Sequence, residues 1–297
     1  SLIPLGGYVQ MKGQDDKKPS LKEEGDDSYN TKKPHQRIII LFAGPFANFI
    51  LAAVLYFTIA MMGATTWASQ IGTVQENSPA FHAGILPNDE ILRINDTEIK
   101  SWDEIGKTII STDGALNFFI KRDGEIIAKT INPHIADSEN MFKEKIKKRM
   151  IGISPSGKII TLELSFSQAL VYAYEKTIFA STMIFQGIQK LIQGAIPSSE
   201  VGGVISIGKV ISDASESSII ALFAITALIS VNLGVLNLLP IPALDGGHIM
   251  FNLYEMITRR KPSDQIFMFL TIMGWVILGS LMLLGIYNDI NRIFLNN

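Results

Sequence analysis

The chain has 297 residues, with 26 lysines and arginines against 28 aspartates and glutamates, so its formal charge is −2. It has no basic excess to collect phosphates, which argues against nucleic-acid binding, and it has no cysteine for disulfides, thiolate metal sites or a thiol nucleophile. Only 18% of the residues are charged and the mean hydropathy is +0.26, whereas soluble domains average about 25% charged residues. Part of the chain is therefore expected to lie in lipid.

The N-terminal segment, 1–37, contains a glycine pair and several lysines. The chain starts with Ser-Leu-Ile-Pro, without methionine and without a signal-peptide pattern. We therefore expect that a preceding segment is missing, with N-terminal processing as the alternative. Gly6 and Gly7 permit a tight turn between apolar neighbours that include Tyr8, which predicts a β-hairpin. This hairpin is either an ordinary surface feature or one associated with a membrane.

Three apolar runs are long enough to span a bilayer, which takes about 20 helical residues. The predicted spans are 38–63, 219–254 and 266–288. Gly44 and Pro45 lie near the start of the first run, where a proline disturbs a helix least. Three buried helices of a large soluble core are the alternative. Runs this long and this uniformly apolar favour an α-helical multi-pass membrane protein.

Lysine and arginine in the flanks predict the orientation of these spans, because basic loops stay in the cytoplasm. Segment 1–37 is basic, and the loop between the second and third spans carries Arg259, Arg260 and Lys261. Both segments are cytoplasmic if the three spans run outward, inward and outward. This orientation places 64–218 on the extracytoplasmic side.

The outer segment begins with a predicted α+β domain at 68–134. The expected elements are strands at 71–74 and 91–94, a short helix that Ser78 and Pro79 open, a helix at 102–110, and a hairpin about the turn 122–125. The string SPAFHAGILPNDEILRINDTEI resembles the PDZ family, with Asn88 where that family has glycine; asparagine tolerates the same left-handed backbone. The resemblance implies binding of an extended peptide at a sheet edge, and a domain that only gates access sterically is the equal alternative.

The rest of the outer segment, 135–218, is expected to hold a linker followed by amphipathic juxtamembrane helices. The linker is polar as far as Gly157, and its basic cluster at 143–149 is typical of a solvated face. The aromatic spacing over 166–195 predicts a pair of amphipathic helices on the membrane surface. A stripe that faces the core of the outer domain is the equally ordinary alternative.

The stretch NLLPIPALDGGH interrupts the second apolar run. Pro240 and Pro242 each remove a backbone donor and break a helix, and broken helices at membrane depth occur only where they line a cavity or pack against protein. Asp245 lies in this break, and a charge near the bilayer centre costs about 2.5–3.5 kcal/mol, which makes it a functional candidate. The alternative is that Asp245 lies at the cytoplasmic interface and caps the next helix through the amides of Gly247 and His248.

These motifs carry a resemblance to a known family. NLLPIPALDGGH is similar to the third motif of the site-two protease family, which consists of membrane-embedded zinc metalloproteases. GPFANF is similar to the motif in the family's second span, and LIPLGGYVQMKG to the loop after its first catalytic helix. With one PDZ domain between the spans, the order resembles the bacterial RseP-like branch.

The resemblance implies a zinc ion whose ligands come from two parts of the chain. The family takes two histidines and a catalytic glutamate from H-E-x-x-H on its first span, and an aspartate from the LDG motif, which Asp245 matches. The four histidines of this chain, His35, His82, His134 and His248, include no pair four residues apart. The catalytic glutamate is therefore absent. We expect truncation upstream of the chain, with a fourth span there, and an inactive homologue is the alternative.

The resemblance also implies substrate handling, because a helical substrate must unwind before its backbone can be cut. The implied substrate-binding residues are Gly6, Gly7, Tyr8, Asn232, Asn237, Pro240 and Pro242. Asn232 and Asn237 lie about 140° apart on an ideal helix, so they either bind an unwound substrate or hold helices together. Gly44, Pro45 and Asn48 are expected to let the first span pack closely against the others.

The implied function is that of a zinc metalloendopeptidase of the inner membrane that cleaves single-span membrane proteins within the bilayer. Anti-sigma factors and signal-peptide remnants are the substrates that the resemblance suggests, and the PDZ domain would filter them and bind a peptide. A catalytically inactive, membrane-anchored PDZ adaptor is the non-enzymatic alternative. A transporter would also use a broken helix and an intramembrane acid, but it predicts an internal repeat, and none is evident between the spans.

Overall fold

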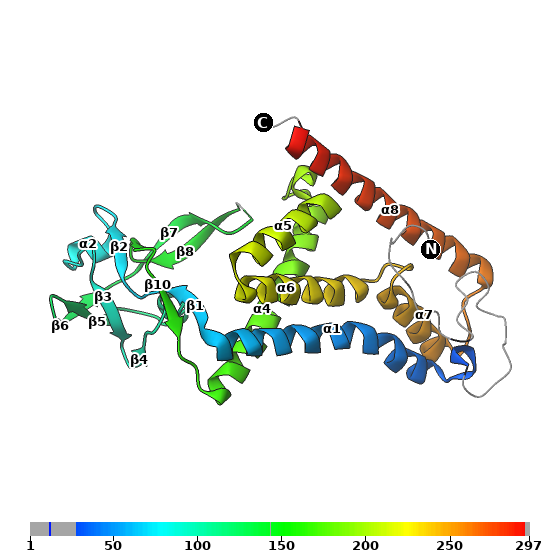
Figure 1. Cartoon of the computed structure of the whole chain (residues 1–297), viewed down its shortest axis with the longest axis horizontal. Coiled ribbons are helices and arrows are strands. Elements are labelled where there is room, and N and C mark those ends of the chain that lie inside the picture. The colour runs from blue at the N-terminus through cyan, green and yellow to red at the C-terminus, as the bar shows by residue number, and fades with distance from the viewer. Residues whose placement is uncertain (1–11, 13–27, 143, 295–297) are drawn as a thin grey trace. The chain divides into compact units, whose positions relative to one another are not determined.

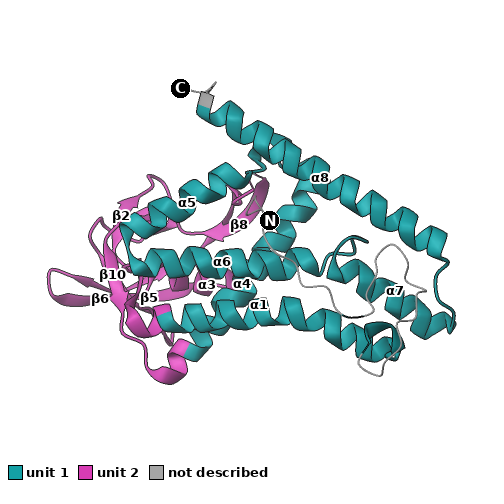
Figure 2. Ribbon diagram, turned by 45° about the vertical axis from the view of Figure 1, so that its right-hand side comes forward, with its two compact units in different colours: residues 1–58, 170–297 teal, residues 59–169 magenta. Residues whose placement is uncertain are grey.

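The computed structural model describes residues 12, 28–142 and 144–294 (Figure 1). The chain divides into two compact units, one formed by 1–58 with 170–297 and the other by 59–169 (Figure 2). The first unit is helical, and the second is built mainly from strands. Each unit is described by itself.

The helical unit consists of long apolar helices and shorter connecting ones. Its elements are η1 (Tyr29–Thr31), α1 (Pro34–Gly63), α4 (Phe166–Ile192), η2 (Ser198–Glu200), α5 (Val204–Ser217), α6 (Ile219–Asn237), α7 (Asp245–Thr258) and α8 (Asp264–Phe294), with the last residues of α1 and the first of α4 in the other unit. Helices α1, α6 and α8 are long and apolar enough to cross a membrane. The three apolar spans predicted from the sequence are confirmed as helices.

Two of these helices differ in detail from the expectation. Helix α1 begins at Pro34, so Pro45 lies inside it and not near its start; the ring of Pro45 leaves the carbonyl of Leu41 without its usual donor. The predicted span 219–254 is two helices, because α6 ends at Asn237 and α7 begins at Asp245. The predicted proline break between them is confirmed.

Small residues hold α1, α4 and α6 together. The buried cluster at this junction consists of Ala52, Ala180, Ala227, Val231 and Val235. Close approach is required here, since a Cβ on Gly234 would lie 3.0 Å from the ring of Phe49. The hydroxyl of Ser230 donates to the carbonyl oxygen of Asn48 at 2.8 Å. Small side chains and hydroxyl bonds of this kind are what helices use to associate in lipid.

A second joint connects the N-terminus of α5 to the C-terminal part of α8. Asp289 is buried, and its carboxylate accepts hydrogen bonds from the backbone amides of Gly203, Ile205 and Ser206 at 2.9–3.0 Å and from the Ser206 hydroxyl. A Cβ on Gly203 would lie 2.5 Å from the backbone of Gly285, so the two backbones nearly touch. The first-turn amides of α5, which have no partner within their own helix, are thus bonded by a carboxylate from another helix.

The second unit is a small α+β domain. Its elements are β1 (Ala64–Trp67), β2 (Ile71–Val74), α2 (Pro79–His82), β3 (Glu90–Ile94), β4 (Thr97–Glu98), α3 (Trp102–Ser111), β5 (Leu116–Arg122), β6 (Glu125–Ile131), β7 (His134–Glu139), β8 (Lys145–Met150), β9 (Ile153–Pro155) and β10 (Ile159–Leu162). The largest sheet has the antiparallel order β4-β3-β5-β6, and β1 pairs with β10, β2 with β9 and β7 with β8. The core is mainly isoleucine around the buried Phe118.

The local predictions for this unit are confirmed at several residues. The Ser78 hydroxyl accepts the Phe81 amide at 3.2 Å as the cap of α2, and Asn88 has a left-handed φ of 72°. The turn between β5 and β6 uses Asp123 and Gly124, both at positive φ, which matches the right-handed twist of a hairpin.

Two expectations for the segment after this sheet are wrong. The polar linker expected from residue 135 to Gly157 instead contains β7, β8 and β9. The turn between β7 and β8 is closed by Asn140, whose side-chain oxygen accepts the amides of Phe142 and Glu144. The helix pair expected at 166–195 is the single helix α4. Because β8 is rich in lysine, its sequence shows little alternation between apolar and polar side chains. For this reason the basic cluster resembles a linker in the sequence.

Candidate functional site

The carboxylate of Asp245 stands at the start of α7 without a hydrogen-bonding partner among the described residues. The N-cap of α7 is Leu244, and its carbonyl oxygen accepts the amides of Gly247 at 3.0 Å and His248 at 3.2 Å. Because these two amides are already bonded, Asp245 does not cap the helix through them. The alternative role considered from the sequence is therefore not the one that the structure shows.

Two glycines fix the start of α7 against the loop that precedes it. A Cβ on Gly246 would lie 2.3 Å from the carbonyl oxygen of Leu239, and one on Gly247 would lie 2.3 Å from that of Ile241. Contacts this short with backbone atoms cannot be relieved by a side-chain rotation. The LDGG motif thus needs glycine at both places so that the helix can pack directly on the interrupted backbone, with Asp245 at its tip.

Helix α1 forms the facing wall of the site. Gly44 is exposed, and a Cβ placed on it would lie 3.7 Å from Oδ2 of Asp245. The GPFANF and LDGG motifs are about 200 residues apart in the sequence, and the structure brings them together. We expected Gly44 to serve close packing of α1. Instead it borders the carboxylate, whereas Asn48 of the same motif contacts α6 by accepting the hydrogen bond of Ser230.

His248 lies three residues after Asp245 and is buried. The centre of its ring is 5.6 Å from the ring of Phe267 on α8 and 6.3 Å from that of Phe251, and those two phenyl rings are themselves 4.7 Å apart. These contacts pack the imidazole into an aromatic cluster between α7 and α8.

The other predicted substrate-binding residues lie on α6 and in the loop after it. Asn232 and Asn237 are half-buried on α6, and in the part of the chain that the structure describes their side-chain amides form no hydrogen bond. Pro240 is exposed and Pro242 is half-buried in the loop between α6 and α7. The predicted hairpin with Gly6, Gly7 and Tyr8 lies outside the described residues.

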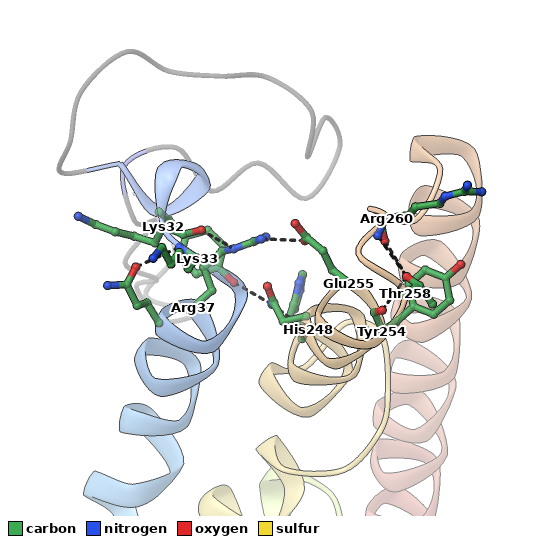
Figure 3. A network of polar contacts seen from close by, with 11 residues as sticks. Lys32, Lys33, Arg37, His248, Tyr254, Glu255, Thr258 and Arg260 are labelled. Carbon is green, nitrogen blue, oxygen red and sulfur yellow. Dashed lines mark hydrogen bonds and ion pairs between the residues drawn. The ribbon is translucent and has the colours of Figure 1, made fainter.

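A network at the other end of α7 was not predicted from the sequence (Figure 3). Arg37 of α1 donates to Oε2 of Glu255 at 2.7 Å, and the amide of Asn252 donates to the Tyr29 hydroxyl at 3.2 Å. In the sequence, Arg37 is one of many basic residues before the first span, and no pattern distinguishes it from the others. The sequence feature that could have indicated this ion pair is Glu255, the single acidic residue that follows the LDG motif on its helix.

The described residues include only part of a zinc site. Carboxylate oxygen is a normal zinc ligand, and Asp245 offers an unpaired carboxylate that borders a glycine, so it fits the role of one ligand. Within residues 12, 28–142 and 144–294, no group of three or more histidine, cysteine, aspartate or glutamate side chains could hold a metal ion. The remaining ligands of a zinc site are not among these residues.

Comparison with known proteins defines the class to which this fold and site belong. The model of peptidase family M50 matches residues 1–281. The chain belongs to this family, the site-two proteases, as the motifs around Gly44 and Asp245 indicate.

The curated relatives include proteins of several bacteria. A protein of Campylobacter jejuni named "Putative zinc metalloprotease" is 45% identical over 99% of this chain and 79% of its own length. One of Helicobacter pylori with the same name is 36% identical over 99% of this chain and 84% of its own length. The metalloprotease MmpA of Caulobacter vibrioides is 29% identical over 98% and 81% of the two chains. The zinc-dependent protease class expected from the sequence is confirmed at the level of the family.

Among solved structures, the chain is similar to the PDZ domain of an SdrC-like protein from Listeria innocua. The identity is 24% over 30% of this chain and 92% of that one, with a TM-score of 0.24. This likeness is too slight to support an argument about fold.

Proposed function

We propose that this chain is the part of a membrane-embedded zinc metalloprotease that supplies the aspartate ligand and the substrate-binding helix, and that the enzyme cleaves single-span membrane proteins within the bilayer. The observation that carries the proposal is the carboxylate of Asp245, which forms no hydrogen bond with the described residues, stands at a break between two apolar helices and faces Gly44.

Helix breaks and buried charges are costly in lipid, which is why their coincidence supports a catalytic role. Backbone polar groups in a break must be satisfied by protein or must line a water-containing cavity. Carboxylates within membrane-spanning segments are rare, and those that occur usually have a function in binding or catalysis. The junction of α6 and α7 contains Pro240 and Pro242 in the break and Asp245 at the first residue of α7. The cost of the broken helix and the cost of the charge therefore fall at the same place.

A zinc ion bound here would polarise a substrate carbonyl and lower the pKa of a bound water. The residues of this chain have other tasks. Asp245 would hold the metal from one side. The side-chain amides of Asn232 and Asn237, which form no hydrogen bond within the described part of the chain, suit hydrogen bonds to the backbone of an unwound substrate. A substrate helix that opens at the site exposes carbonyls and amides that need new partners. Gly44 leaves room in front of the carboxylate.

The test compares Asp245→Asn with Asp213→Asn in the natural full-length gene product. Asp213 is an exposed aspartate on α5 and serves as the matched control. In proteoliposomes with a single-span model substrate, Asp245→Asn is expected to lower cleavage at least about 100-fold and to reduce bound zinc, whereas Asp213→Asn leaves both unchanged. Equal cleavage by both variants would refute the assignment.

For the second unit we propose a PDZ-like role in peptide recognition on the extracytoplasmic side of the inner membrane. The supporting observation is a groove of about 540 Å³ between α3 and the segment that leads into β9. Ile105 and Ile109 from α3 and Ile151 and Ile153 from the other side give it an apolar lining. An extended peptide could add as a strand along this edge.

The charge at the groove favours an acidic peptide. Lys148 lies at the groove and forms no ion pair with the residues that the structure describes. Arg149, also at the groove, is held by the carbonyl oxygen of Gly114 and lies 3.8 Å from Asp113. Lys148 is therefore the cation that remains available to a ligand.

Gly106 offers a clean test of the groove, because a Cβ there would meet nothing within 4 Å. Gly106→Phe is expected to fill the groove and abolish the binding of a labelled acidic peptide to the full chain in detergent, and Gly106→Ala at the same position should bind normally. Undiminished binding by Gly106→Phe would rule out the groove as the peptide site.

This groove also favours the second candidate function, a membrane-anchored adaptor that binds peptides without cutting them. Zinc analysis of the natural full-length product separates the two candidates. A protease retains about one zinc per chain, and an adaptor needs none.

A further inference from the structure

Helix α7 presents three of its polar residues toward one side. At 100° per residue, Asp245, Asn252 and Glu255 fall within about 80° of one another. On α1, Arg37 and Gly44 fall within about 20°. The face of α1 that borders the Asp245 carboxylate is therefore also the face that meets the distal end of α7.

The contacts pair these two faces in antiparallel register. Gly44 faces Asp245, with 3.7 Å between the Cβ position and Oδ2, and Arg37 binds Glu255 at 2.7 Å. The side chains of Arg37 and Glu255 are only 10% and 16% exposed, and Nε of Arg37 is also bonded to the carbonyl oxygen of Lys32 at 3.1 Å. The paired guanidinium and carboxylate are shown in Figure 3.

Asn252 adds a second connection one turn closer to the site. Its amide donates to the Tyr29 hydroxyl at 3.2 Å and to the carbonyl oxygen of His248 at 2.8 Å. Tyr29, which precedes α1, is buried, and the guanidinium of Arg37 lies 6.0 Å from the centre of its ring. The segment around the start of α1 thus holds α7 at two consecutive turns.

Gly246 and Gly247 hold the first turn of α7 against the loop, and the contacts of Asn252 and Glu255 hold its last turns against rotation about the helix axis. The helix has 14 residues and follows a loop that contains Pro240 and Pro242, and it ends at Arg259 in a left-handed conformation. The carboxylate of Asp245 makes no hydrogen bond of its own among the described residues. Its direction is therefore set by how the whole helix is turned, and a rotation of α7 would move it away from Gly44.

We propose that Arg37 and Glu255 are positioning residues, whose ion pair fixes the rotation of α7 and so directs the Asp245 carboxylate toward Gly44. The effect of the ion pair on the direction of the Asp245 carboxylate is inferred from the contacts alone. Its effect on zinc binding rests on the proposed function. Removing either partner leaves the other charge buried and unpaired, which favours a rotation of α7 that brings that charge to water.

The first test is geometric and needs no metal. Because the chain has no cysteine, the pair Gly44→Cys with Asp245→Cys reports the distance between the two positions through disulfide formation under mild oxidation, which requires Cα atoms within about 7 Å. We expect a high yield in the otherwise unchanged protein, a yield several-fold lower with Arg37→Gln, and recovery with the charge exchange Arg37→Glu plus Glu255→Arg. Arg292→Gln, which removes the contact of Arg292 with Glu200 in the same unit, is the matched control and should not lower the yield.

The second test measures zinc in the natural full-length product with Asp245 intact. Loss of an outer partner typically weakens metal binding by about 10- to 100-fold. Arg37→Gln and Glu255→Gln should each raise the zinc dissociation constant by such a factor and lower kcat with KM unchanged, and the charge exchange should restore both.

The outcomes separate the two proposals. An unchanged disulfide yield with Arg37→Gln, or no disulfide in the parent pair, would overturn the positioning role. So would variants that lose only thermal stability while keeping their zinc affinity. If the disulfide responds as expected but the product binds no zinc and cleaves nothing, the positioning of Asp245 stands and the proteolytic function fails.

Discussion

Asp245 and Gly44 face each other across the gap between α7 and α1, with Oδ2 of the aspartate 3.7 Å from the position that a Cβ on Gly44 would take. This is ordinary van der Waals contact, so a methyl group fits, whereas a longer side chain that points toward Asp245 would fill the space in front of the carboxylate. The glycine leaves the carboxylate reachable, and this relationship leads to the first prediction.

Gly44→Ala should retain most of the proteolytic activity of the full-length product, whereas Gly44→Leu should lose it by about 100-fold. The leucine side chain would occupy the space in front of the Asp245 carboxylate, and displacement of a reacting group by about 1 Å can cost that much. Cleavage of a single-span substrate measures the effect. A fully active Gly44→Leu variant would show that nothing needs to approach the carboxylate from this side.

Gly247→Ala should destabilise the helical unit by about 1–3 kcal/mol, because the methyl group would overlap the carbonyl oxygen of Ile241 at 2.3 Å. Gly208→Ala on α5 is the control, since a Cβ there meets nothing within 4 Å and alanine is the better helix former by about 0.5–1 kcal/mol. Thermal unfolding in detergent measures both changes. Equal melting temperatures for the two variants would contradict the close packing of the LDGG backbone.

Asp289→Asn should loosen the start of α5. The two carboxylate oxygens accept hydrogen bonds from the backbone amides of Gly203, Ile205 and Ser206. In asparagine one of these oxygens is replaced by an NH2 group, which cannot accept a hydrogen bond from a backbone amide. Hydrogen exchange at the first turn of α5 should become several-fold faster, with α6 unaffected. Glu200→Gln, an exposed acid on η2, should leave exchange at α5 unchanged.

Arg122→Gln should destabilise the second unit by about 3 kcal/mol, because Asp89 is only 1% exposed and would remain as a buried, unpaired charge. The two side chains form a bidentate pair at 2.7 Å, and Arg122 also donates to the carbonyl oxygen of Gly84 at 2.8 Å. Urea unfolding followed by tryptophan fluorescence, to which Trp67 and Trp102 of this unit contribute, measures the loss. Arg93→Gln, at an arginine that stacks on Phe119 and forms no ion pair with another described residue, should cost clearly less.

The contribution of Arg122 should not vary with pH in the working range. Its hydrogen bonds to Asp89 raise the pKa of Arg122 above the ordinary value of an arginine side chain. A base whose pKa is higher in the folded protein stabilises the fold fully below its unfolded pKa and loses that contribution only as the pH rises through the folded value. The stability difference between Arg122→Gln and the parent protein should therefore be the same at about pH 7 and about pH 9. A difference that shrinks over this interval would contradict the assignment.

Local sequence patterns determined the three long apolar helices and the break between α6 and α7. Hydropathy over some 20 residues, or a proline that cannot donate, acts through the chain's own neighbours and needs no tertiary information. The same holds for the cap at Ser78 and the turn at Gly124. The identity of Asp245 as the outstanding acid also follows from the sequence, since no other formal charge lies between 218 and 253.

Tertiary structure alone decided which residues meet. Arg37 and Glu255 are separated by 218 positions, and each looks like an ordinary flanking charge until α1 and α7 are placed side by side. The contact of Gly44 with Asp245, the carboxylate that caps α5 from α8, and the β7–β8 hairpin in the expected linker are likewise long-range or weakly patterned. Periodicity reports which face of an element is apolar, but it carries no information about the partner that covers that face.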